Sequence, residues 1–201
     1  ESDRWNSFDR FHETTDTLVR HYEAAGAVAQ VDAIQTGGQI GSGRWIIQEA
    51  ADVRAATVDV LAPIKERLLD YKENPWHVIQ WSSATPKQGL RAQLIILDSR
   101  REIERLSPGS LRGKVVLTCL EPRALLGLLA DRGAVGIISD RPVTNLPHAL
   151  AWNKFGWGAI PLERATARLV GFVLSERQGE KLRRLLQKHG ALQLLLKADI
   201  R

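Results

Sequence analysis

Cysteine is nearly absent from this sequence of 201 residues, which contains a single one, Cys119. One cysteine excludes a disulfide within the chain and any zinc site built from several thiolates. Long apolar runs are also missing, so we expect no transmembrane helix and no membrane partner. The chain begins at Glu1 with neither an initiator methionine nor a signal-type segment. We therefore expect a piece excised from a longer protein.

A concentration of positive charge is the next missing feature. The net charge is +5, but the pairs Arg100-Arg101 and Arg183-Arg184 stand among acidic residues. A nucleic-acid interface needs basic residues gathered on one face. A basic nucleic-acid-binding module stays an alternative, but we expect a solvated surface and no nucleic-acid partner. The apolar fraction of 44% and the charged fraction of 25% are typical of a globular protein.

Complete catalytic and ligand-binding motifs are missing as well. Residues 12–16 read His-Glu-Thr-Thr-Asp, which differs from the helical zinc motif His-Glu-x-x-His in its last position. The glycine-rich residues 36–44 precede a strand-like run instead of the helix start that would hold a phosphate. We interpret them as a hairpin connection. The sequence therefore predicts no metal ligands in this chain.

The chain is organised around residues 111–140. Lys114 to Cys119 is a short apolar run typical of a buried strand. Pro122 suits the first turn of a following helix, and Gly133 suits its end. Residues 134–139 form a second apolar run. Strand, helix and strand in about thirty residues predict a βαβ crossover between parallel strands.

A second strand–helix–strand unit ends the chain. It consists of a strand at 169–174, a helix that Ser175 and Gln178 begin as a capping box, and a strand at 192–200. An amphipathic helix is predicted over residues 1–26, and its large aromatic residues need a partner to pack on. Further strands are predicted at 27–34, 45–47, 54–61, 77–81 and 91–98, a helix at 99–106, and a short helix or irregular segment at 64–71. The fold class is mixed α/β.

The loop over residues 141–159 carries the candidate binding residues. Loops on rigid scaffolds often hold functional side chains, and indole rings and amides offer stacking and hydrogen bonds to a peptide. The predicted binding residues are His148, Trp152, Asn153 and Trp157. The alternative, that both tryptophans fold back over the core or pack on a neighbouring domain, stays open.

Two other arrangements are alternatives. Cys119 as nucleophile with His148 as base would make a freestanding hydrolase, but a thiol in an apolar strand is typical of a buried structural residue. Asp98, Asp140 and Glu163 follow strands and would suit paired acids, although acids at strand ends usually face water. We therefore predict no catalytic residues.

Three segments together resemble the protease-associated (PA) domain. They are LRGKVVLT, a helix ending in ADRGAVGIISD, and LVGFVLSERQGEKLRRLL. The last contains Ser175, Gly179 and Leu182 in the family's Ser-x-x-x-Gly-x-x-Leu helix. The resemblance covers about Tyr71 to Arg201. The run GRWIIQEAADVRAATVDVL and the N-terminal helix look like the region preceding an inserted PA domain in aminopeptidases with two zinc ions.

This resemblance implies a PA-type swivelling β/β/α domain with βαβ units, preceded by an amphipathic helix. It divides the chain into residues 1–62, which belong to or pack on the parent peptidase, and residues 63–201, the PA-like domain. It implies a non-catalytic accessory module that controls substrate access or contacts a protein. The expected partners are the catalytic domain of the same parent chain and a peptide or protein substrate. Zinc is expected in the parent catalytic domain and no cofactor in this fragment, because the family's His-x-Asp ligands have no counterpart here. A secreted or periplasmic location is expected.

Overall fold

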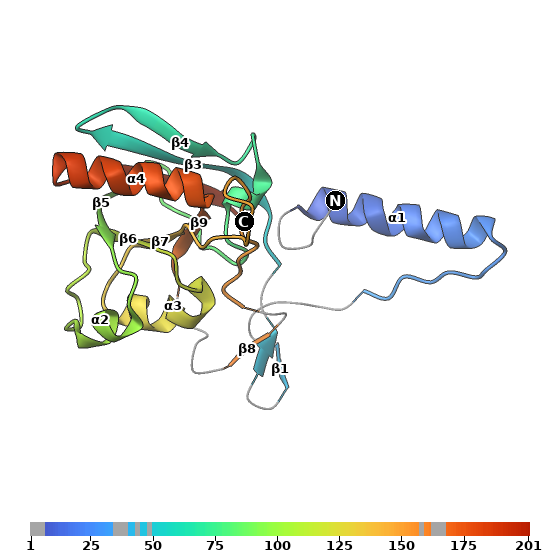
Figure 1. Cartoon of the computed structure of the whole chain (residues 1–201). Helices are drawn as coiled ribbons and strands as arrows, with labels where there is room; N and C mark the ends of the chain where they lie inside the picture. Colours follow the sequence, from blue (N-terminus) through green and yellow to red (C-terminus); the bar gives the residue numbers. More distant parts are fainter. Residues whose placement is uncertain (1–6, 34–39, 43–44, 48–49, 157–158, 162–167) are drawn as a thin grey trace.

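A seven-stranded mixed sheet forms the centre of the molecule. The structure is a computed structural model that describes residues 7–33, 40–42, 45–47, 50–156, 159–161 and 168–201. The strands of the sheet are β3 (Val53–Ala62), β4 (Glu66–Asp70), β5 (Leu90–Ile96), β6 (Lys114–Thr118), β7 (Gly136–Ser139), β9 (Val170–Val173) and β10 (Gln193–Ile200). Their spatial order is β4-β3-β10-β5-β6-β7-β9 (Figure 1). Strands β5, β6, β7 and β9 are parallel to one another. Strand β10 is antiparallel to both of its neighbours, β3 and β5, and β4 is antiparallel to β3. The mixed α/β prediction is confirmed.

The remaining elements lie around this sheet. Helices α2 (Arg100–Arg105), α3 (Pro122–Asp131) and α4 (Glu176–His189) pack on it, and the 3-10 turn η1 (Pro75–His77) lies before β5. Strands β1 (Ile40–Ser42), β2 (Trp45–Ile47) and β8 (Ala159–Pro161) make a small antiparallel sheet. Helix α1 (Phe8–Ala24) stands away from the rest of the molecule (Figure 1). We call residues 51–156 and 168–201 the body.

Two apolar layers, one on each side of the parallel strands, hold the body together. Val115 and Leu117 of β6 join the cluster that contains Leu182 of α4. Val116 points the other way, into the cluster with Leu125 of α3. This alternation follows from the two-residue period of a strand. Each such fully buried side chain contributes about 1.5–3 kcal/mol, so both helices are fixed firmly on the sheet.

The crossover predicted over residues 111–140 is confirmed, and the second predicted strand–helix–strand unit is present as β9, α4 and β10. Strands β6 and β7 are parallel neighbours with α3 between them in sequence. Strand β10 lies between β3 and β5, antiparallel to both, so β9, α4 and β10 make no parallel crossover. The residues of β10 alternate between buried leucines and the exposed Lys197 and Asp199. That one-sided pattern is typical of antiparallel strands.

Three local predictions are wrong. Residues 27–33 form no strand, and the segment predicted as a short helix or irregular forms β4 over residues 66–70. The segment 77–81, predicted as a strand, makes two isolated bridges, one between Val78 and Phe172 of β9 and one between Gln80 and Lys154. It covers the outer edge of β9, where the Ser82 hydroxyl accepts a hydrogen bond from the Gly171 N–H at 3.0 Å. An uncovered edge would leave unpaired backbone groups.

Residues near the two ends of the body lie side by side. The backbone N–H of Asp52 donates to the Arg201 carbonyl at 2.8 Å, and the N–H of Arg201 donates back at 3.1 Å. The predicted division at residue 62 stays a prediction, with β3 paired to β10 inside the main sheet. No helix in the described parts of the chain has the length and apolarity that crossing a membrane requires.

Candidate functional site at the carboxyl edge of the parallel strands

Four polar residues follow directly on the parallel strands. Asp98 comes shortly after β5, Cys119 after β6, Asp140 after β7 and Ser175 after β9. Because parallel strands end at the same edge of a sheet, all four lie along one rim. In open α/β sheets this carboxyl edge is the usual place for ligands. It is therefore the first candidate site of this molecule.

Arg183 of α4 joins the two acids of this rim. Its Nη1 donates to Asp98 Oδ2 at 2.6 Å. Its Nε donates to Asp140 Oδ2 at 2.6 Å, and its Nη2 donates to Asp140 Oδ1 at 2.9 Å. The Asp140 side chain is only 5% exposed. A planar guanidinium with several donors suits this double clamp, so one arginine holds both the exposed Asp98 and the buried Asp140.

The start of α4 explains how Arg183 reaches this position. Ser175 caps the helix by accepting from the Gln178 N–H, and the Gln178 side chain returns a bond to the Ser175 N–H. Gly179 then passes directly against Asp140, where any Cβ would overlap with the aspartate side chain. Arg183 follows one turn later on the same face. The Ser-x-x-x-Gly-x-x-Leu pattern is thus a cap, a close approach and the buried Leu182.

The network sets the protonation of its members. Burial would raise the pKa of Asp98, but hydrogen bonds from Arg183 and from the Cys119 backbone outweigh it and lower the pKa. Hydrogen bonding to Asp140 and Asp98 raises the pKa of Arg183. Burial, and then the contact with Asp98, raises the pKa of the Cys119 thiol. The rim is therefore built to keep Asp98 charged and Cys119 protonated.

This electrostatic setting disfavours Cys119 as a nucleophile. Reactive cysteines are thiolates stabilised by positive neighbours, whereas Cys119 lies beside carboxylates. The ring of His148 contacts Arg177, with 3.3 Å between Nε2 and Nη1. Cys119 is also half-buried at the end of β6 and not fully buried inside the strand, contrary to the predicted structural thiol. No contact in the described residues favours a Cys119–His148 pair.

The predicted binding residues take different positions in the loop after β7. His148 and Trp152 are exposed, and the Lys154 ammonium lies 4.0 Å from the centre of the Trp152 ring. Asn153 is buried, and its Nδ2 donates to Ser139 Oγ at 3.3 Å. Trp157 and the candidate acid Glu163 lie outside the described residues. Binding by His148, Trp152, Asn153 and Trp157 stays a prediction.

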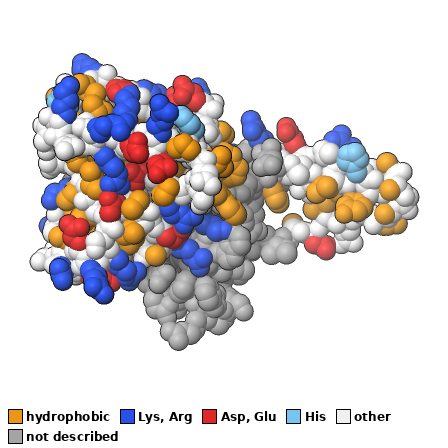
Figure 2. Space-filling view, viewed as in Figure 1, with side chains coloured by type: hydrophobic (Ala, Val, Ile, Leu, Met, Phe, Trp, Pro, Cys, Tyr) orange, Lys and Arg blue, Asp and Glu red, His pale blue; other side chains and the backbone are white. Residues whose placement is uncertain are grey.

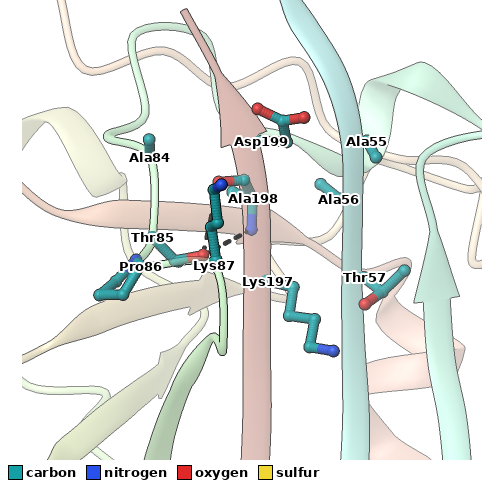
Figure 3. Close-up of a pocket in the computed structure, with 10 residues that line it drawn as sticks. All are labelled: Ala55, Ala56, Thr57, Ala84, Thr85, Pro86, Lys87, Lys197, Ala198 and Asp199. Atoms are coloured by element: carbon teal, nitrogen blue, oxygen red, sulfur yellow. Dashed lines mark hydrogen bonds between the residues drawn. The ribbon is translucent and has the colours of Figure 1, made fainter.

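A groove of about 410 Å³ lies elsewhere, on β3 and β10. Small side chains, including Ala55 and Thr57, line it together with Lys197 and Asp199 (Figure 3). The segment carrying Thr85 borders it, and the Thr85 N–H donates to the Ala198 carbonyl at 2.9 Å. Lys87, Lys197 and Asp199 place charges of both signs at this groove.

Metal-ligating residues and surface charge can be described for part of the chain. Within the described ranges, no group of three or more His, Cys, Asp or Glu residues is arranged to hold a metal ion. His12 and Asp16 are exposed on α1. Basic and acidic side chains are interspersed on the face of the body in Figure 2. A polyanion would meet mixed charge there.

Comparison of the structure with solved structures identifies related folds. The fold is related to M28 peptidase structures. A peptidase M28 precursor from Shewanella amazonensis matches with a TM-score of 0.54 and 18% identity over 76% of this chain and 36% of its own. An aminopeptidase from Aneurinibacillus sp. strain AM-1 matches with a TM-score of 0.55 and 12% identity over 100% of this chain and 42% of its own. This chain thus spans well under half the length of both proteins.

The sequence itself gives no comparable match. No protein-family model and no curated protein matches it. Identities of 12% and 18% show a shared fold and leave the chemistry to be argued from this chain. A fragment of an M28-type peptidase is consistent with both matches.

Sequence reasoning missed the residues that organise the rim and the groove. The sequence indicates only that Arg183 is one of several scattered charges, although its spacing of four residues from Gly179 places both on one helix face. The expectation that acids at strand ends face water holds for Asp98, which is exposed, and is wrong for Asp140, which is buried; Arg183 binds both. The groove residues Thr85 and Lys197 gave no sequence signal, because a turn and a distant strand meet only in the fold.

Proposed function

We propose that this chain is a non-catalytic, PA-type accessory module of a larger zinc-dependent aminopeptidase. The observation that carries the proposal is the pair of fold matches that span 36% and 42% of two peptidase chains. The module would control access of peptides to the catalytic cleft or contact a protein substrate. Zinc would be bound by the parent catalytic domain, and the polypeptide would be secreted or periplasmic.

The path of the chain supports this role. Asp52 and Arg201 are joined by two backbone hydrogen bonds, so the body can extend from a single point of a larger domain. Insertions of whole domains are tolerated where the two ends of the insert lie close together. The carboxyl rim supports it too, since Arg183 engages both acids and leaves them poorly suited to acid–base catalysis.

Two exposed surfaces are the candidates for substrate or protein contact. One is the loop with His148 and Trp152, where an exposed indole lies at the carboxyl edge. The other is the groove on β3 and β10 with Lys197 and Asp199 at its border. Exposed aromatic residues are common anchors in peptide recognition, so the loop is the preferred surface.

The test uses the natural longer polypeptide that contains this chain. Residues 52–201 are replaced by a short Gly-Ser linker, which the adjacent positions of Asp52 and Arg201 allow. We expect the shortened enzyme to hydrolyse aminoacyl anilides and to differ from the intact enzyme in its kcat/KM for longer peptides. A Trp152→Ala variant, with exposed Trp76→Ala as the matched control, tests the loop in the same assay.

The outcomes separate cleanly. The isolated 201-residue chain should hydrolyse neither substrate in the presence of zinc. Zinc-dependent turnover by the isolated chain would overturn the non-catalytic role. Absence of aminopeptidase activity in the intact longer polypeptide would overturn the proposal as a whole.

A further inference from the structure

The groove on β3 and β10 lies on the face of the sheet that is turned away from α4. Val58 of β3 and Leu196 of β10 belong to the buried cluster that contains Leu182 of α4. Because side chains alternate between the two faces of a strand, Thr57 and Lys197 point to the opposite face, where the groove lies. Its floor consists of small side chains, so an extended main chain could approach the sheet closely.

A turn that is fastened to β10 forms one side of the groove. The Thr85 N–H donates to the Ala198 carbonyl at 2.9 Å, and the Ala198 N–H donates back to Thr85 Oγ1 at 3.0 Å. At the end of the turn, Gly89 has a φ of +80°, and a Cβ there would lie 2.8 Å from Lys197 Cγ. Glycine therefore lets the turn lie against the stem of Lys197. The groove and the backbone of Lys87 are thus fixed before any ligand arrives, which lowers the cost of binding.

The charged side chains of the groove lack partners of their own. Among the residues that the structure describes, Lys87, Lys197 and Asp199 take part in no side-chain ion pair. By contrast, Asp59 of β3 is bound by Arg67. Figure 3 shows Lys87 and Lys197 on either side of the path of β10, with Asp199 farther along that strand. Two ammonium groups and one carboxylate give the groove an excess of one positive charge.

A second hollow, of about 270 Å³, adjoins the groove on the side of Arg201. Ala84 lines both hollows. The second one is bordered by Arg168, which forms no ion pair with the described residues, and by Arg201, which pairs with Asp52. The positive side chains therefore continue from the groove toward the two neighbouring ends of the body. In the proposed function, this is the side that faces the parent peptidase.

We propose that the groove binds the carboxyl-terminal carboxylate of a peptide substrate, with Lys87 and Lys197 as its charged partners. The inference rests on the proposed function and assigns a ligand to the second of its two surfaces. An aminopeptidase acts at the amino end of a peptide, so the carboxyl end is the part that can reach an accessory module. Every unmodified peptide carries this carboxylate, whatever its sequence.

Asp199 explains why a single terminal charge fits better than a row of charges. It follows Lys197 by two residues, so both side chains lie on one face of β10, about 7 Å apart. A second negative charge next to the first would be repelled by Asp199. Neutral peptide units would instead offer it N–H donors, which carboxylates accept readily. A carboxylate preceded by uncharged main chain therefore matches the order of charges along the strand.

The first test measures binding to the 201-residue chain by NMR titration. The probes are penta-alanine with a free carboxylate and the same peptide with a carboxyl-terminal amide. We expect the free acid to shift the amide signals of Thr57, Thr85 and Ala198 and to bind about fivefold more tightly than the amide, because exposed ion pairs are individually weak. This preference should shrink in 0.5 M NaCl, which screens exposed charges.

Variants assign the preference to the two lysines. Lys87→Gln/Lys197→Gln should bind the acid and the amide equally, because glutamine keeps a long polar side chain without the charge. The matched control Lys65→Gln/Lys72→Gln removes two exposed lysines outside the groove and should keep the fivefold preference. Both variants have the same net charge, so an effect of overall charge would appear in both.

Three results would overturn the proposal. Equal binding of the acid and the amide by the unaltered chain would show that the groove does not recognise the carboxylate. Equally tight binding of acetate would show a site for small anions without peptide contacts. Binding of an amidated penta-peptide with a central glutamate as tightly as the free acid would assign the groove to acidic side chains instead of the peptide terminus.

The second test uses the natural longer polypeptide and separates this inference from the proposed function. We expect its kcat/KM for alanine peptides to favour the free acid over the amide, and Lys87→Gln/Lys197→Gln to remove this preference without changing hydrolysis of alanine p-nitroanilide. An active enzyme whose preference survives in this variant would contradict the inference and leave the proposed function intact. A longer polypeptide without aminopeptidase activity would contradict the proposed function, whereas carboxylate-dependent binding to the 201-residue chain would still establish the peptide site.

Discussion

Arg183 is the single side chain on which the carboxyl rim depends most. It holds Asp98 and the nearly buried Asp140 at once. Removing the arginine would leave Asp140 with an uncompensated charge in a site that water hardly reaches, and such losses cost several kcal/mol in buried pairs. The neighbouring Arg184 pairs with the exposed Glu180 at 3.4 Å. Two adjacent arginines therefore have different energetic roles.

We expect Arg183→Leu to lower the free energy of unfolding by about 2 kcal/mol or more. Arg184→Leu is the matched control and should change it by no more than about 0.5 kcal/mol. Urea unfolding of both variants at pH 7 gives the comparison. Equal effects of the two substitutions would show that Arg183 is an ordinary surface residue.

The Asp98–Arg183 contact also predicts a dependence of stability on pH. The folded-state pKa of Asp98 is below its usual value. Burial alone would raise this pKa, but hydrogen bonds from Arg183 and Cys119 lower it by more. Its contribution is therefore present above the unfolded-state pKa of about 3.9 and is lost as the pH falls through the folded-state pKa. Asp98→Asn should be less stable than wild type at pH 7, and the difference should shrink below about pH 4.

Urea unfolding between pH 7 and pH 3 measures this difference. The same substitution made in an Arg183→Leu background should show a much smaller pH-dependent difference, because the partner is gone. A difference that stays constant with pH in the wild-type background would contradict the assignment to this ion pair.

Among the elements, α4 is the one whose sequence is most closely tied to its position. Its start is fixed by the Ser175–Gln178 capping box, and its second turn lies against Asp140 at Gly179. Leu182 then enters the core fully. Contacts at three points along α4 hold the helix in place and thereby fix the position of Arg183.

Gly179→Ala should therefore destabilise the protein, although alanine favours helices over glycine by about 1 kcal/mol. The added Cβ would overlap with the Asp140 side chain and force α4 away from the sheet. Gly127→Ala in α3 is the matched control, because nothing lies within 4 Å of its Cβ position. That variant should be neutral or slightly more stable. Thermal unfolding of both variants decides the point, and a stabilised Gly179→Ala would refute the close approach.

At the scale of the whole molecule, the described residues form the body with its core, a small three-stranded sheet and helix α1, which stands apart from both. None of the residues of α1 is buried, and the extended residues 27–33 connect it to the rest. Isolated helices of this length are only marginally stable in water. The stability of the body should therefore be independent of α1.

Elastase, which cleaves after small apolar residues, should cut the chain within residues 27–33 (AVAQVDA). The remaining body should unfold at a midpoint within about 2 °C of the intact chain, because a shift of that size corresponds to at most about 1 kcal/mol in a domain of this size. Circular dichroism of the intact and cleaved proteins measures both midpoints. A large drop would show that α1 supports the body.

The sequence alone determined those parts of the protein that depend on neighbours in the chain. The apolar runs and Gly133 defined β6, α3 and β7, and Ser175 and Gln178 fixed the start of α4, because periodicity, capping and turn chemistry are local. The amphipathic pattern of α1 could likewise be foreseen from residue spacing alone.

Only the tertiary structure decided the position of β10, the cover on the edge of β9 and the arrangement of the rim. Asp98 and Arg183 are 85 residues apart in sequence, and Asp140 and Arg183 are 43 apart. Which acid meets which arginine depends on the order of strands in the sheet and on how closely Gly179 lets α4 approach. Neither is encoded in a local pattern, because strand order is set by the summed burial of two apolar layers.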